Sequence, residues 1–480
     1  MKSILVGWLI LFGLGALPVN AAVSAPTTPE PHPLMVIPFI ALLLCIALMP
    51  FIHKHHWEKH YPKVATACGL VTAFYYFVVL HNVPRMLTCL IEYAGFMALI
   101  GSLFVIAGGI HIKMSGRSSP ALNAGILALG AVIANLIGTT GASMLFIRPF
   151  LRINKHRIAP YHIVFFIFIV SNIGGVLTPI GDPPLFLGYL KGVPFFWLIQ
   201  LPQVLLSWLL CIGVLLALFF VIDSINFRQH TPASVPTARS RIRLEGSHNF
   251  IWLLLIIGFV LAQKAEWLQR LEHWPHPISV GNQLGWSARK TTESLTTLLM
   301  ALLMVGTAVL SYRFSNKNAL RENDFHFEPI REIGILFLGI FATMVPALDL
   351  LETHAADIGI ATVGHYYWAT GCLSAILDNA PTYLNFLAAA FGLQNLSLEN
   401  PVHMQAMLAN AATAKYIVAI SLGAVFFGAV TYIGNGPNFM VKSIAESDGV
   451  RCPSFFGYVV KYALPILLPL FALVSWLFLR

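Results

Sequence analysis

Charge is the scarcest feature of this 480-residue sequence. Only 10% of its residues are charged, whereas 57% are hydrophobic. So few charges cannot cover the surface of water-soluble domains, and a chain of soluble domains is excluded. Apolar runs of roughly 17–25 residues recur along the chain, and this is the length an α-helix needs to cross about 30 Å of hydrocarbon. The sequence therefore predicts an all-α polytopic membrane protein in a lipid bilayer.

Several motifs typical of other protein classes are missing. Six cysteines are present without a Cys-x-x-Cys pair, so we expect free thiols and no structural metal. Neither the Gly-x-Ser-x-Gly motif of hydrolases nor the His-Glu-x-x-His zinc motif occurs, and no Walker motif for ATP is present. We therefore expect no enzyme activity and no cofactor. The net charge of +9 comes from short basic connectors rather than from one basic domain, so no nucleic-acid partner is expected.

The first residues have the pattern of a cleavable signal peptide. Lys2 precedes an apolar stretch, and Val19-Asn20-Ala21 forms a cleavage site of small residues, so residues 1–21 are predicted to be removed. An uncleaved first helix is the alternative. With the mature N-terminus in the periplasm, most basic loops fall in the cytoplasm, as the positive-inside rule requires. The predicted location is the bacterial inner (cytoplasmic) membrane.

The two halves of the chain repeat each other. Glu92 and Glu332 lie 240 positions apart, and the same offset places residues 138–141 on residues 378–381. An offset of 253 then places residues 175–186 on residues 428–439, with several glycines and prolines matched. Residues 22–223 and 249–480 form the two repeats, and residues 224–248 form a cytoplasmic linker. Each repeat has five crossings, an odd number, so the sequence predicts two inverted five-helix repeats, as in secondary transporters.

Each repeat is predicted to contain a re-entrant hairpin and a transmembrane helix broken by proline and glycine. The hairpins cover residues 119–148 and 361–391, and the broken helices cover residues 160–190 and 407–446. Glycine and proline interrupt the helical hydrogen bonds, which leaves backbone carbonyl and amide groups free to bind a ligand inside the membrane. The residues that break the helices are Gly174, Gly175, Pro179, Gly181, Pro183, Pro184, Gly434, Gly436 and Pro437.

Two aspartates at membrane depth, Asp182 and Asp378, are the leading candidate ligands for a cation and for protons. An ionised carboxylate there costs at least about 2.5–3.5 kcal/mol, so a partner or a transported cation is expected. The alternative role for each is to cap a helix. Asn435 replaces Asp182 in the second repeat, and Asp378 is expected to supply the missing carboxylate. Neutral oxygen ligands for a hard cation are expected from Asn172, Thr178, Asn379, Thr431 and Asn435, and from the hairpin tip residues Thr139, Thr140 and Ser143.

These motifs resemble those of a known superfamily. The segment from Ser171 to Pro184 is similar to the signature of bacterial NhaD-type sodium/proton antiporters and of related citrate transporters in the ion transporter superfamily. The segments 377–381 and 432–439 resemble the second-half motifs of that group. The resemblance implies a homodimer in which scaffold domains hold mobile transport domains that move like an elevator. Dicarboxylate carriers of the superfamily have Ser-Asn-Thr at both hairpin tips, whereas this chain has Gly-Thr-Thr-Gly and Asp-Asn-Ala-Pro.

Two transport functions follow from these features. The first is exchange of sodium or lithium ions for protons, in which the two aspartates bind either the metal ion or protons and no ATP is needed. The second is cation-coupled uptake of citrate or another carboxylate, for which no arginine at membrane depth is evident. A passive channel does not require inverted broken repeats.

Overall fold

The computed structural model describes residues 30–115, 118–230, 241–265, 268, 281 and 284–479. The predicted signal peptide and residues 231–240 of the predicted linker lie outside these residues. Within them, ten helices are long and apolar enough to cross a membrane. The chain is therefore an all-α polytopic membrane protein, as predicted.

One short sheet was not predicted. Strand β1 (His111–Ser115) pairs antiparallel with β2 (Arg241–Glu245), so that His111 lies opposite Glu245. β2 falls inside the predicted linker, and α9 (Pro202–His230) extends into the same segment. The alternation of charged and aliphatic residues in β2 is typical of a strand, but five residues give a weak signal.

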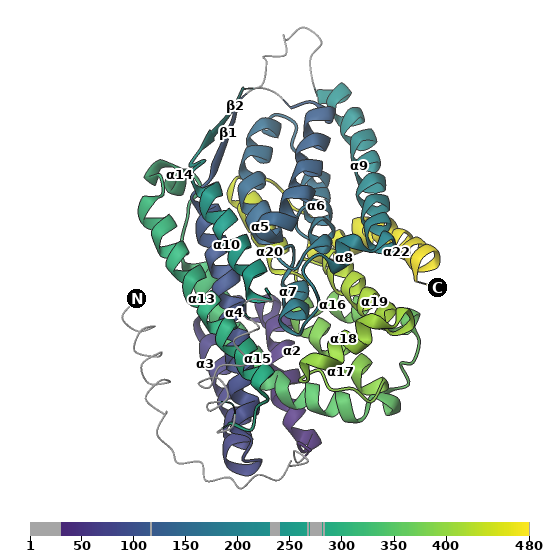
Figure 1. The fold of residues 1–480 in the computed structure, drawn as a ribbon. Helices are drawn as coiled ribbons and strands as arrows, with labels where there is room; N and C mark the ends of the chain where they lie inside the picture. Colours follow the sequence, from purple (N-terminus) through teal and green to yellow (C-terminus); the bar gives the residue numbers. More distant parts are fainter. Residues whose placement is uncertain are drawn as a thin grey trace.

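Six helices form one layer of the molecule, which we call the α4 group (Figure 1). Within it, α3 packs against α2 and α15, and α13 packs against α4 and α10. Its centre contains the stacked rings of Phe96 and Phe337, whose centroids are 4.9 Å apart. The group consists of α2 (Ile37–Ile52), α3 (Lys54–Phe74), α4 (Val83–Gly108), α10 (Asn249–Gln263), α13 (Ala288–Phe314) and α15 (Glu328–Thr353).

The helices of the two hairpins and of the two broken segments, together with α9 and α22, form a second layer beside it, which we call the hairpin group (Figure 1). It consists of α5 (Pro120–Asn154), α6 (Pro160–Ile169), α7 (Pro183–Leu190), α9, α16 (Val363–Ser374), α17 (Asn379–Leu393), α19 (Ala411–Phe427), α20 (Gly436–Ser447) and α22 (Leu464–Phe478). Shorter helices connect these elements or the two groups: α8 (Trp197–Gln200), α14 (Lys317–Glu322), α18 (Pro401–Ala409) and α21 (Phe455–Tyr458).

The helix α5 is a hairpin with two arms. Gly138 has φ 79° and ψ 155°, a conformation that favours glycine, and it interrupts the helix at the predicted tip. The ends of the two arms meet, because Asn123 and Asn154 exchange side-chain hydrogen bonds of 2.8 and 2.9 Å. The returning arm continues to Asn154, beyond the predicted end at residue 148. The second hairpin comprises α16 and α17, which pack together on either side of residues 375–378.

Two helices are broken at matched places. In the first repeat, α6 is followed by a 3-10 turn (Ile173–Leu177), an extended segment and α7. In the second, α19 is followed by a 3-10 turn (Gly428–Val430), an extended segment and α20. Prolines occupy the first turns of α7 and α20, where the missing amide proton costs no helical hydrogen bond.

A buried carboxylate joins α9 to the first hairpin and to α6. Asp223 is fully buried and accepts hydrogen bonds from the guanidinium of Arg157, from Tyr161 at 2.6 Å and from Asn123 at 2.9 Å. His162 Nε2 also lies 3.1 Å from this carboxylate. These bonds fix three elements of the hairpin group at one end.

We expect Asp223→Ala to lower the free energy of unfolding by about 3–5 kcal/mol, because it leaves the Arg157 guanidinium buried without its partner. Glu322→Ala is the control, since Glu322 pairs with Arg152 at 3.2 Å but is 46% exposed. Its cost should stay below about 1 kcal/mol. Thermal unfolding of the purified proteins in detergent measures both, and equal melting temperatures for the two variants would contradict the structural role of Asp223.

Candidate functional site

The two extended breaks have the same local structure. Thr178 Oγ1 donates to Asn135 O at 2.6 Å, and Thr431 Oγ1 donates to Ala375 O at 2.6 Å. These bonds tie each break to the hairpin of its own repeat at the matched position, because residues 135 and 375 are 240 positions apart. The two predicted threonine ligands therefore hold the breaks in place.

The glycines allow the backbone of both breaks to fold tightly. A Cβ atom on Gly181 would lie 2.0 Å from Gly175 O, and one on Gly434 would lie 2.7 Å from Gly428 O. Thr139 N donates to Gly181 O at 2.8 Å, which joins the first hairpin tip to the break. Any side chain at Gly181 would push these segments apart.

Asp182 lies at the centre of the two hairpins and the two breaks. It is fully buried and precedes the first residue of α7, but its carboxylate does not cap that helix. Instead, Oδ1 accepts hydrogen bonds from Thr139 at 2.7 Å and Asn435 at 2.9 Å, and Oδ2 accepts one from Asn379 at 2.6 Å. The structure thus brings four of the predicted site residues into direct contact.

Four helices begin at this carboxylate. Thr139 opens the returning arm of α5, Asn379 opens α17, and α7 and α20 begin directly after Asp182 and Asn435. The N-terminus of each helix carries a partial positive charge. All three direct donors are neutral, and among the described residues no lysine, arginine or histidine pairs with Asp182. Helix ends and neutral donors therefore stabilise the carboxylate.

A second layer of polar groups supports the first. Asn435 also donates to Ser171 O at 3.2 Å, and the Ser171 hydroxyl lies 2.8 Å from that of Ser143. Asn172 donates to Asn438 Oδ1 at 2.6 Å, and Asn438 donates to Gly428 O and Thr431 O. Asn135, Ser171 and Asn438 were not predicted as site residues. Ser171 and Asn438 directly flank predicted positions of the broken segments.

One buried acceptor beside the carboxylate has no partner. Asn172 Oδ1 receives no hydrogen bond, although the side chain is fully buried. A Cβ atom on Gly428 would lie 3.0 Å from this oxygen and 3.6 Å from Asn379 Nδ2. The glycine therefore leaves space next to an unused oxygen, close to the side chains that hold Asp182.

The second predicted carboxylate has a different environment. Asp378 is half-buried, and its Oδ1 accepts a hydrogen bond from Ala380 N at 3.0 Å, which caps α17. The capping alternative therefore describes Asp378 and not Asp182. The group that meets Asp182 from the second break is Asn435 itself.

A cavity leads from α4 to Asp182. It encloses about 360 Å³ of empty space, its open mouth included. Apolar side chains of α4 line one wall, and the first hairpin tip, with Thr139 and Thr140, lines the other. Among the described residues that line it, Asp182 carries the only charge. The cavity therefore reaches from the interface of the two helix groups to the residues around Asp182.

The comparisons with known proteins give one result for the family. A family model described as "Putative citrate transport" matches residues 30–479, so the chain belongs to that family of transporters. The search of the curated proteins found no match to the chain. Membership covers nearly the whole described chain and agrees with the citrate transporter resemblance of the sequence motifs; it does not single out the NhaD-type antiporters.

We expect Gly181→Ala to destabilise the first break by about 1–3 kcal/mol, the usual cost of overpacking, because the new Cβ has no space against Gly175 O. Gly436→Ala is the matched control in the second break, since a Cβ there meets no atom within 4 Å. The yield of monodisperse protein in size-exclusion chromatography and its melting temperature measure the effect. Equal values for the two variants would show that the close approach at Gly181 is not required.

Proposed function

We propose that this transporter exchanges sodium or lithium ions for protons across the membrane, with Asp182 as the shared binding group. The observation that carries the proposal is a fully buried carboxylate whose direct partners are all neutral. A buried negative charge without a cationic partner is costly inside a membrane. A transported cation or a proton removes that cost.

The site also favours a cation over an anion. Helix N-termini that meet at the midplane of a transporter are suited to bind an anionic substrate. Here the Asp182 carboxylate already occupies that position, so the partial positive charges are used within the protein. A second negative group beside Asp182 would be repelled, whereas a cation would be attracted.

The surrounding oxygens are suited to a small hard cation. Asp182 offers two carboxylate oxygens, Thr139 offers a hydroxyl and Asn172 offers an unused carbonyl oxygen. Asn379 and Asn435 donate through their amide nitrogens, and a half-turn of each side chain presents its oxygen instead. Metal binding therefore exchanges amide donors for oxygen ligands, and release of the metal ion reverses the exchange.

Transport also requires access from both sides of the membrane. We propose that the hairpin group moves relative to the α4 group, because the site lies within the hairpin group and its cavity opens toward α4. Such a motion moves the intact site past the α4 group, which stays in place. The homodimer and the opposite orientation of the two repeats belong to the same proposal, as do the periplasmic N-terminus and the bacterial inner membrane.

Cation-coupled uptake of citrate or another carboxylate is the second candidate. The family description favours it. In this case the cation bound at Asp182 would neutralise the site before a carboxylate enters the adjoining cavity. No lysine, arginine or histidine is among the described residues that line this cavity, and we therefore place cation exchange first.

Everted membrane vesicles distinguish the two functions. Respiration acidifies the vesicles, and a pH-sensitive dye then reports proton release when sodium or lithium is added. We expect release from vesicles with the unaltered protein and at least a tenfold loss with Asp182→Asn, because hydrogen bonds and contacts to a charged group contribute about 1.5–3 kcal/mol and about 1.4 kcal/mol is tenfold. Saturable uptake of labelled citrate without a sodium response would overturn the exchange proposal and support the second candidate.

Asp378→Asn separates charge from helix capping. Asparagine caps a helix about as well as aspartate, so the melting temperature should stay unchanged. If the carboxylate of Asp378 takes part in binding the cation or the proton, exchange in the same vesicles should fall by about tenfold, equal to about 1.4 kcal/mol. Unchanged exchange would limit the role of Asp378 to the cap of α17.

A further inference from the structure

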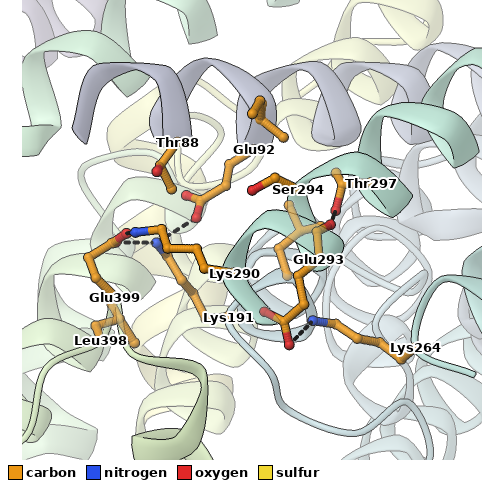
Figure 2. A pocket seen from close by; sticks show the side chains of 12 residues that line it. Thr88, Glu92, Lys191, Lys264, Lys290, Glu293, Ser294, Thr297, Leu398 and Glu399 are labelled. Carbon is orange, nitrogen blue, oxygen red and sulfur yellow. Dashed lines mark hydrogen bonds and ion pairs between the residues drawn. The ribbon is translucent and has the colours of Figure 1, made fainter. Parts of the chain in front are cut away.

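A second cavity lies between the two helix groups, away from Asp182 (Figure 2). It encloses about 510 Å³ of empty space, its open mouth included. Its lining contains three lysines, which suggests a site for an anion. Each lysine already has a carboxylate partner, however: Lys191 lies 2.7 Å from Glu92, Lys290 3.2 Å from Glu399 and Lys264 3.8 Å from Glu293. The charges of this lining are balanced, and an anionic ligand would have to displace its own carboxylates.

The ion pairs differ in which helix groups they join. Glu399 follows α17 in the hairpin group, and it pairs with Arg85 of α4 at 2.7 Å and with Lys290 of α13 at 3.2 Å. Lys191 follows α7, also in the hairpin group, and pairs with Glu92 of α4. Three ion pairs therefore cross the interface of the two groups. We call these five residues the ion-pair clasp.

The opposite end of the interface has more exposed ion pairs, although Arg148 of α5 also donates there to Asn323 O. There, Arg152 of α5 lies 3.2 Å from Glu322, but the two side chains are 39% and 46% exposed. Exposed ion pairs contribute only about 0–1 kcal/mol. In the clasp, the side chains of Lys191 and Arg85 are 4% and 9% exposed. Solvent therefore screens the clasp less than it screens the pair of Arg152 with Glu322.

Glu399 remains charged at neutral pH. Burial by itself raises the pKa of Glu399, but the positive charges of Arg85, Lys191 and Lys290 outweigh it and hold this pKa well below its usual range. Because the pKa is lowered in the folded protein, the stabilisation is complete at neutral pH and is lost only as the pH falls toward that of an ordinary glutamate and below. The clasp is therefore a mechanical contact rather than a pH switch in the neutral range.

We infer that the ion-pair clasp holds the hairpin group against the α4 group in this conformation and must open during each transport cycle. The inference rests on the relative motion of the two groups that we propose for transport. The clasp is suited to open because each buried cation keeps a partner on its own side of the interface: Arg85 keeps Asp349 at 2.8 Å, and Lys191 keeps Glu399 at 2.6 Å. Opening therefore does not strand these two buried cations.

Cross-linking tests the inference in the full-length protein. Lys290→Cys and Glu399→Cys are combined in a variant without the six native cysteines, and a bifunctional methanethiosulfonate reagent then bridges the two positions. We expect transport in vesicles to fall by at least about tenfold after bridging, since a conformational step that cannot occur blocks turnover, and to recover when the bridge is reduced. The second pair, Glu92→Cys with Lys191→Cys, tests the same interface if the first variant folds poorly.

The matched control bridges two positions within one group. Lys264→Cys with Glu293→Cys lies in the same cavity, and both residues belong to the α4 side of it. Bridging this pair should leave transport unchanged. Unchanged transport after bridging of positions 290 and 399 would overturn the inference, and so would loss of transport in that stably folded variant before the reagent is added. If the exchange proposal itself fails, the unbridged protein gives no sodium response. Citrate uptake then measures whether bridging blocks transport.

Discussion

One buried negative charge organises the centre of this protein. Asp182 receives hydrogen bonds from both hairpins and from the second break, and four helices begin around it. Because these donors come from segments far apart in the sequence, the carboxylate joins the two halves of the chain. Its surroundings stabilise the charge only in part, since every donor is neutral. In the exchange that we propose, this incomplete stabilisation lets a small cation or a proton bind and also leave.

The rest of the hairpin group keeps this arrangement in position. The threonines of the two breaks are bonded to the hairpins, and the glycines let the backbone segments approach closely. At the far end of the group, Asp223 joins α9 to α5 and α6 through Arg157 and its neighbours. Asp223 is paired with a full positive charge and Asp182 is not. The two buried carboxylates thus differ: Asp223 is a fixed support, and Asp182 is the group to which we assign exchange.

Much of this architecture is predictable from the sequence, because its causes are local. Long apolar runs gave the membrane spans, and glycine and proline marked the hairpin tip at Gly138 and the break before Asp182. Residue contacts between distant segments were not predictable in this way. The prediction that Asp378 supplies a second carboxylate beside Asp182 follows from a count of charges. In the structure, Asp378 caps α17, and the side chain that reaches Asp182 from the second break is that of Asn435. The ion-pair clasp was missed for the same reason, because Arg85 of α4 and the connector residues Lys191 and Glu399 lie far apart in the sequence.

The bond between Asn435 and Asp182 has a consequence for the origin of the chain. The two breaks match each other closely, as expected if one ancestral segment was duplicated. The Asn435 amide nitrogen now lies 2.9 Å from the Asp182 carboxylate. With aspartate at both positions, two carboxylates would lie this close together. Like charges at such a distance cannot both stay ionised. Two copies with asparagine would contain no charge for a cation. A difference at this single pair of positions, Asp182 and Asn435, is therefore enough to turn two copies of a structural segment into one site. Each half of the chain supplies the group that the other half lacks.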